Sequence, residues 1–81
     1  MRRPRYAIYR PRDGAWLCDL LTIRGDDGQP IVVGVTWTTD PDQALRYRGA
    51  KGAIHAALQL GPGDALQITN ARGRVIHDVV F

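Results

Sequence analysis

Few side chains in this 81-residue chain could carry out covalent or metal chemistry. The sequence holds one cysteine and two histidines, and it contains no serine and no glutamate. Cys18, His55 and His77 are far apart, without the CxxC or HxxxH spacing that is typical of metal sites. Serine is the commonest hydroxyl nucleophile and glutamate is a usual carboxylate acid. We therefore expect no bound metal, no cofactor and no enzymatic activity.

Two interpretations of Cys18 are open. It could act as a nucleophile if the fold brings His55 or His77 beside it. Alternatively, because it lies between Leu17 and Asp19 in a mainly apolar stretch, it could serve as a small buried hydrophobe, the usual role of such a cysteine. The aspartate pairs at 26–27 and 40–42 are explained by turn and helix-cap roles.

Arginine is the most prominent chemical group of the chain. The net charge is +3 and the pI is about 9.6, with a single lysine among the eleven basic residues. The arginines lie close to tyrosines in the sequence, and guanidinium groups bind carboxylates and phosphates and stack on rings. These features predict a binding surface. The residues that we expect to contact a partner are Arg10, Arg12, Trp37, Arg46, Tyr47, Arg48 and Lys51.

Two classes of partner are consistent with this surface. A protein partner is favoured by tryptophan bordered by arginine, which is the usual composition of an interface hot spot. A nucleic acid is the alternative, because arginines bind phosphates while aromatic rings stack on bases. In that case the contacts would come from Arg3, Arg5, Tyr6 and Tyr9.

Three stretches with strand character make up the first half of the chain. They cover residues 5–10, 15–23 and 31–37, and turn residues separate them. The second stretch is apolar on both faces, which predicts that a neighbouring layer, a second copy or a partner covers it. In the third, strand alternation predicts one shared face for Ile31, Val33, Val35 and Trp37.

Helical signals follow. Asp40 can cap a helix that has Pro41 at its first position and ends near Tyr47. A second helix is expected over residues 50–60, with an apolar stripe at i, i+3 and i+4 spacing formed by Ala53, Ile54, Ala57 and Leu58. Two further strands are expected over 65–69 and 74–81. The chain thus predicts one α+β domain over residues 1–81, with about five antiparallel strands in the order β-β-β-α-β-β and one main helix on one face.

Neither a membrane span nor a secretory signal is expected. The longest apolar run is strand-sized, and no apolar stretch follows the basic N-terminus. With one cysteine, no internal disulfide can form, which is compatible with a reducing compartment. We expect a cytoplasmic protein that is a monomer or a weak homodimer.

The sequence resembles small proteins carried by phages and prophages. The resemblance lies in Tyr6-Ala7-Ile8-Tyr9-Arg10-Pro11, in Gly14-Ala15-Trp16-Leu17, and in the stretch from Trp37 through Asp40-Pro41-Asp42 to Tyr47. The resemblance covers about the first two-thirds of the chain. Some of these small proteins are anti-CRISPR inhibitors, and this basic single-domain chain without a catalytic constellation is similar to several of them. This resemblance implies a non-enzymatic inhibitor that covers a surface of a multisubunit CRISPR effector complex and blocks target-DNA binding or nuclease recruitment. It assigns no functional residue.

Overall fold

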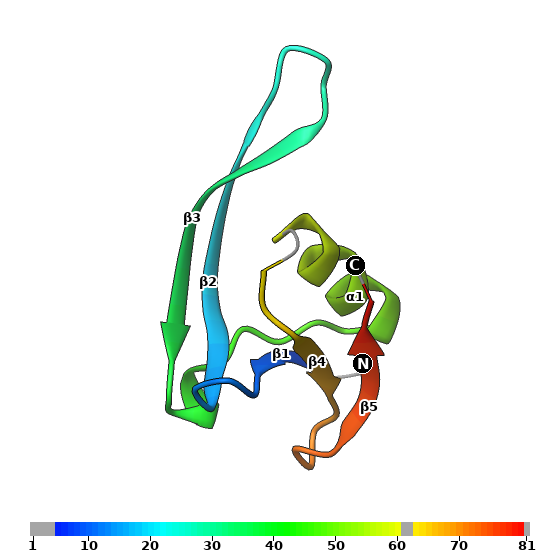
Figure 1. The fold of residues 1–81 in the computed structure, drawn as a ribbon. Coiled ribbons are helices and arrows are strands. Elements are labelled where there is room, and N and C mark those ends of the chain that lie inside the picture. Colours follow the sequence, from blue (N-terminus) through cyan, green and yellow to red (C-terminus); the bar gives the residue numbers. More distant parts are fainter. Residues whose placement is uncertain (1–4, 61–62, 81) are drawn as a thin grey trace.

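Five antiparallel strands and one α-helix form the fold of this chain, for which a computed structural model describes residues 5–60 and 63–80 (Figure 1). The strands are arranged in the order β3-β2-β1-β4-β5, and the helix contacts β1, β4 and β5. This arrangement confirms the α+β prediction. The elements are β1 (Ala7–Arg10), β2 (Ala15–Arg24), β3 (Pro30–Thr38), the 3-10 turn η1 (Pro41–Gln43), α1 (Ala50–Gln59), β4 (Leu66–Thr69) and β5 (Val75–Val79).

The hydrophobic core lies between α1 and the short central strands. Ile8, Leu17 and Ile68 are fully buried there. The helix contributes mainly alanines, whose small side chains allow its backbone to lie close to the sheet. Ala53 and Ala57 are buried as expected, but Leu58 is 46% exposed, so its predicted place in the stripe is wrong. Ala56 is buried in its stead, because the helix turns its alanine face toward the sheet.

The predicted first helix is a single 3-10 turn. Asp40 caps it as expected, since its carboxylate accepts a hydrogen bond from the Asp42 nitrogen. The turn ends at Gln43, however, and does not reach Tyr47. The backbone of Tyr47 instead forms an antiparallel bridge with Tyr6, in which the Tyr47 nitrogen lies 2.7 Å from the Tyr6 oxygen. This cross-chain pairing holds the segment extended and prevents it from continuing as a helix.

The β2–β3 hairpin is much longer than the strands beside it. β1 pairs with β2 only at Tyr9–Trp16 and Arg10–Ala15, whereas β3 pairs with β2 from Trp16 to Arg24. Residues 18–36 therefore project from the domain as a two-stranded ribbon, which we call the arm (Figure 1). Its tip includes Gly28, whose positive φ of 81° is a conformation that glycine adopts without strain.

Two register shifts change which side chains share a face of the arm. One lies between Leu17 and Asp19 of β2, and at the other Val33 of β3 has no opposing residue. Val35 consequently opposes Leu20, whereas Ile31 opposes Ile23. Since Leu20 and Ile23 are three residues apart on β2, they point to opposite faces. The single face predicted for Ile31, Val33, Val35 and Trp37 is therefore wrong, because the β-bulge interrupts the alternation.

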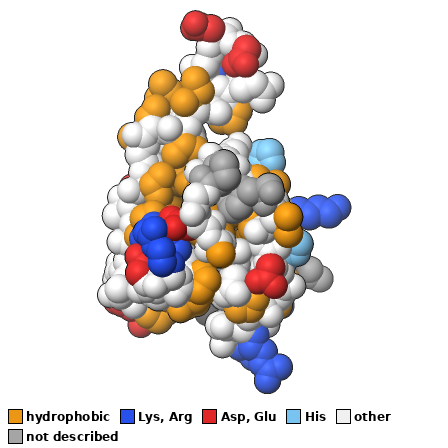
Figure 2. All heavy atoms as spheres, viewed as in Figure 1, with side chains coloured by type: hydrophobic (Ala, Val, Ile, Leu, Met, Phe, Trp, Pro, Cys, Tyr) orange, Lys and Arg blue, Asp and Glu red, His pale blue; other side chains and the backbone are white. Residues whose placement is uncertain are grey.

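The arm carries most of its large hydrophobic side chains in solvent. The exposed fraction is 60% for Leu21 and 53% for Ile23, and Ile31, Val33 and Val35 are also exposed. In Figure 2 hydrophobic atoms form a column that runs from the body along the arm, with acidic groups at its far end. Val35 also lines a hollow with Leu60 and Leu66 of the body, whereas Leu21, Ile23 and Ile31 lie on the opposite face of the arm. None of the helices that the structure describes is both long and apolar enough to cross a membrane.

The difference in burial between body and arm predicts different costs of truncation. Leu17→Ala or Ile68→Ala should lower the free energy of unfolding by about 2–5 kcal/mol, because each leaves a cavity in the core. Ile31→Ala on the arm should change it by about 0.5 kcal/mol, as is usual for surface positions. Urea unfolding followed by circular dichroism measures both, and equal losses at the two places would contradict this description of the core.

Candidate binding surfaces

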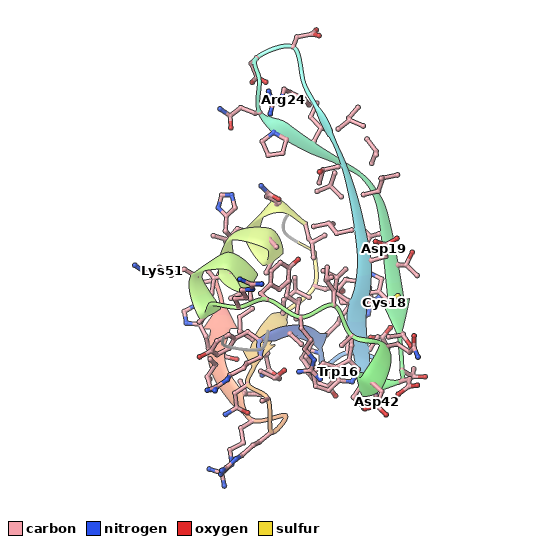
Figure 3. The ribbon with its side chains drawn as sticks, turned by 180° about the vertical axis from the view of Figure 1, so that it is seen from behind. Trp16, Cys18, Asp19, Arg24, Asp42 and Lys51 are labelled. Carbon is pink, nitrogen blue, oxygen red and sulfur yellow. The ribbon has the colours of Figure 1, made fainter. Side chains whose placement is uncertain are left out.

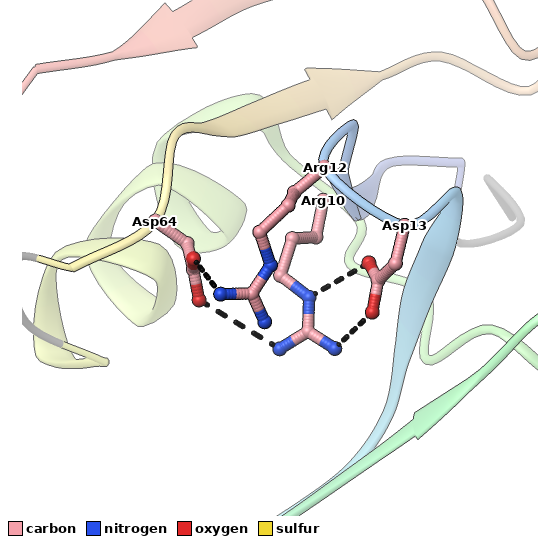
Figure 4. Close-up of polar contacts among 4 residues, drawn as sticks. All are labelled: Arg10, Arg12, Asp13 and Asp64. Carbon is pink, nitrogen blue, oxygen red and sulfur yellow. Dashed lines mark hydrogen bonds and ion pairs between the residues drawn. The ribbon is translucent and has the colours of Figure 1, made fainter.

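Arg10 is the centre of a cluster at the base of the arm. Its Nε and one terminal nitrogen donate to the two carboxylate oxygens of Asp13, at 2.9 and 2.6 Å. Its guanidinium carbon lies 4.1 Å from the centroid of the Trp37 ring. The other terminal nitrogen lies 3.8 Å from an Asp64 oxygen (Figure 4). A forked ion pair combined with ring stacking holds a guanidinium in one orientation.

Arg12 completes the cluster. Its guanidinium forms an ion pair with Asp64 at 2.7 Å, and its side chain is 66% exposed. The cluster thus joins the β1–β2 turn, strand β3 and the segment before β4. Three of the predicted partner-binding residues, Arg10, Arg12 and Trp37, do come together, but both arginines are paired with aspartates of the same chain.

The cluster shifts the protonation equilibria of its members. The hydrogen bonds from Arg10 lower the pKa of the Asp13 carboxyl, because they favour its charged form. The same contact raises the pKa of Arg10. At neutral pH both groups are charged, and the pair is intact.

The remaining predicted residues lie along the segment between η1 and α1. Arg46 donates to the carbonyl oxygens of Arg5 and Pro41, both at 3.3 Å, and so supports the extended path of this segment. Tyr47 packs partly against the core, and burial raises the pKa of its hydroxyl. Arg48 and Lys51 are exposed. Among the residues that the structure describes, neither of these two cations has an ion-pair partner within 4.0 Å.

The tyrosines proposed for nucleic-acid stacking are partly used within the fold. Tyr6 packs against the core, and the Tyr9 ring lies 4.7 Å from that of Trp16 at an angle of 51°. Arg5 is exposed, and Arg3 lies outside the described residues. These aromatic rings therefore do not form a free stacking platform of the kind that single-stranded nucleic acids use.

The thiol and the two imidazoles are placed on separate elements. Cys18 is half-buried at the β2 bulge, and Figure 3 shows it on the arm. His55 is exposed on α1, where its ring is hydrogen-bonded to Gln59 at 3.2 Å. His77 is on β5, which β1 and β4 separate from β2. Over 5–60 and 63–80, no three potential metal ligands gather. The geometry does not favour the interpretation of Cys18 as a nucleophile.

A small hollow lies beside the arginine cluster. It has a volume of about 160 Å³ and is lined in part by Trp37, Leu60 and Asp64. Pockets for organic ligands usually measure about 300–1,000 Å³. The hollow is too small to favour a cofactor-sized ligand.

The surface that sequence analysis did not place is the arm itself. The sequence feature that indicated it is the second strand, which is apolar on both faces. Strand periodicity, however, does not reveal how far a strand extends beyond its neighbours. The arm is also net acidic, because Asp19, Asp26 and Asp27 outnumber Arg24, whereas the whole chain carries +3. Apart from Arg24, the basic groups therefore belong to the body, whereas the arm carries five of the exposed large hydrophobic side chains.

Comparison with known proteins gives no relative. No family model, no curated protein and no solved structure matches the chain.

The arginine cluster predicts a difference between its two cations. Arg10→Ala should lower the free energy of unfolding by about 1–2 kcal/mol, since it removes both the stacking on Trp37 and the forked bond to Asp13. Arg12→Ala should cost less than about 0.5 kcal/mol, because its ion pair is largely solvated. Arg10→Lys should be intermediate, as lysine lacks the planar fork. Urea unfolding measures all three, and equal effects at positions 10 and 12 would contradict the assigned roles.

The lowered pKa of Asp13 predicts an acid-dependent contribution to stability. The ion pair stabilises the fold above the ordinary carboxyl value of 3.8, and this contribution is lost as the pH falls through the lower value of the folded state. Asp13→Asn should therefore destabilise the protein at neutral pH and have less effect near about pH 2. Thermal unfolding of both proteins across this range is the measurement, and a difference that is independent of pH would exclude the ion pair as its cause.

Proposed function

We propose that this protein is a non-enzymatic binding protein that acts by covering a surface of a protein partner. The observation that carries this proposal is the arm, on which Leu21, Ile23 and Ile31 share one solvent-exposed face. Contiguous exposed hydrophobic groups of this kind usually mark interaction sites. A two-stranded ribbon also has open backbone edges that can pair with another strand.

The chemistry of the arm describes the partner site. Leu21, Ile23 and Ile31 share one face, because Ile23 opposes Ile31 and Leu21 lies two residues before Ile23. Asp26 and Asp27 are exposed at the tip. A complementary site would have a hydrophobic centre and a basic rim where it meets the tip. Charged rims increase the rate of encounter, while the buried hydrophobic contacts maintain the complex.

The basic residues of the body supply a second contact area in this proposal. Arg48 and Lys51 are the predicted residues that are exposed and have no ion-pair partner among the described residues, whereas Arg10, Arg12 and Trp37 shape the base of the arm. Arg10, Arg12 and Trp37 therefore act on binding mainly indirectly, because they hold β3 against the β1–β2 turn. Arg46 and Tyr47 similarly support the segment that presents Arg48.

A finer proposal rests on the sequence resemblance alone. In it, the partner is a multisubunit CRISPR effector complex in the cytoplasm of a host cell, and the protein blocks target-DNA binding or nuclease recruitment. Occlusion needs no reacting group, which agrees with the separate placement of Cys18, His55 and His77. Addition of the purified protein to an effector before its target DNA would test this identity directly.

Fewer observations support the alternative function, a small nucleic-acid-binding module. The arm is acidic, so it would be repelled by phosphates, and the Tyr9 ring packs at a tilt against that of Trp16. Anisotropy titration with single-stranded and duplex probes at low salt distinguishes the two functions. Tight binding with a steep salt dependence would favour the nucleic-acid module over the proposed protein-binding function.

The proposal predicts that a charge on the arm face will prevent partner capture. Ile31→Lys should reduce capture from a bacterial lysate at least about tenfold, because a buried cation would be left without a partner in the interface. Ile76→Lys is the matched control, since Ile76 is exposed to 45% but lies on β5 at the opposite sheet edge. Quantitative mass spectrometry of the captured proteins is the measurement. Capture that is unchanged by Ile31→Lys, or equally lost with both variants, would contradict a role for the arm.

A further inference from the structure

We propose that two copies of this chain pair through their arms, with β2 of one copy antiparallel to β2 of the other and the twofold axis at Thr22. The partner of this edge is thus a second copy. The proposal goes beyond the proposed function, because it concerns the backbone edge of β2 and leaves the hydrophobic face of the arm available to another protein.

The first argument is the unpaired edge of β2. On the side away from β3, β2 pairs with β1 at Ala15 and Trp16, and the Leu17 carbonyl accepts a hydrogen bond from the Leu45 nitrogen at 2.8 Å. From Asp19 to Arg24, the described residues offer β2 no backbone partner on this side, and the Leu20 nitrogen donates to the Asp19 carboxylate at 3.0 Å. A row of unpaired N–H and C=O groups on an apolar strand favours pairing with another strand.

The second argument is the fit of the side chains. In an antiparallel pair of identical strands, opposed residues point to the same face of the sheet. The twofold axis must therefore lie between one residue and the same residue of the second copy. With the axis at Thr22, Leu21 opposes Ile23 of the second copy, and Ile23 opposes its Leu21. Apolar cross-strand pairs of this kind stabilise a sheet. An axis at Leu21 would instead place the Asp19 carboxylate opposite Ile23.

The third argument is charge, which distinguishes the two edges of the arm. Pairing through β2 brings the acidic tip of one arm level with Leu17 of the other copy. There the Leu45 nitrogen is bonded, and Arg46 and Arg48 follow it in the chain. Opposite charges would therefore meet at both ends of the paired region.

Pairing through β3 would have the opposite effect. It would bring the tip of each arm to the base of β3 in the other copy, next to the capped turn that contains Asp40 and Asp42. Figure 3 shows Asp42 at the base of the arm and Arg24 toward its tip. Four aspartates would then approach one another, and like charges across an interface oppose association. Charge thus favours the β2 edge.

The resulting dimer would contain a four-stranded sheet in the order β3-β2-β2-β3. Leu21, Ile23 and Ile31 of both copies would line one face of it as a continuous apolar surface. Such a surface would present twice the area of a single arm to a partner. The dimer and the capture of a partner are separable, because Ile31 lies on β3, away from the new strand pair.

Cysteine crosslinking tests the axis directly. Thr22→Cys in a Cys18→Ala background should form a covalent dimer under mild oxidation, because opposed residues of antiparallel strands have Cα atoms about 4.5–5.5 Å apart, within the range of a disulfide. Thr36→Cys in the same background is the control, as Thr36 is also exposed but lies on β3. Nonreducing electrophoresis and light scattering give the readout. A monomer at every soluble concentration, or crosslinking through position 36 and not 22, would overturn the proposal.

Charge reversal tests the electrostatic part. Asp27→Arg and Arg48→Asp should each raise the dimer dissociation constant about tenfold, and their combination should restore it, because the opposite charges are exchanged. Sedimentation velocity measures the constants, and Ile31→Lys should leave dimerisation unchanged while it impairs capture. Additive losses in the double variant would refute the predicted contact. Retained dimerisation without partner capture would instead count against the proposed function alone.

Discussion

Unequal strand length is the constraint on which the other features of this structure depend. β1 and β4 have four residues each, whereas β2 and β3 have ten and nine. The helix contacts β1, β4 and β5, and of the β2–β3 hairpin only the end that carries Leu17, Leu20 and Trp37 packs against the core. Burial of apolar surface stabilises that part and leaves the rest in solvent. A small fold therefore has both a complete core and an exposed apolar arm.

The arginine cluster joins these two regions. Arg10 belongs to the body, but its guanidinium lies over Trp37 at the base of the arm and is held by Asp13 in the adjoining turn. Arg12 extends the contact to Asp64. Most surface ion pairs contribute little to stability. This one is reinforced by stacking on an aromatic ring, and so it can define the angle at which the arm leaves the body.

Charge and hydrophobicity are separated along the molecule. The arm is net acidic and apolar, whereas the basic residues other than Arg24 belong to the body, with Arg48 and Lys51 exposed on it. Such a distribution gives the two ends of the molecule different surface chemistry. It also means that the overall charge of +3 describes neither surface by itself, so composition alone misses the acidic character of the arm.

The sequence by itself determined the elements and their order. Apolar alternation, turn residues and the Asp40-Pro41 cap depend on local interactions, and they placed each strand and the helix near its observed bounds. Tertiary structure decided the rest. The bridge between Tyr6 and Tyr47 replaced a predicted helix with an extended segment, and an unopposed Val33 reversed the face of Ile31. The pairing of Arg10 and Arg12 with aspartates also depends on the fold, because the ion pairs to Asp64 join residues that are more than fifty positions apart. Local patterns carry no information about such pairings, nor about how far one strand extends beyond the next.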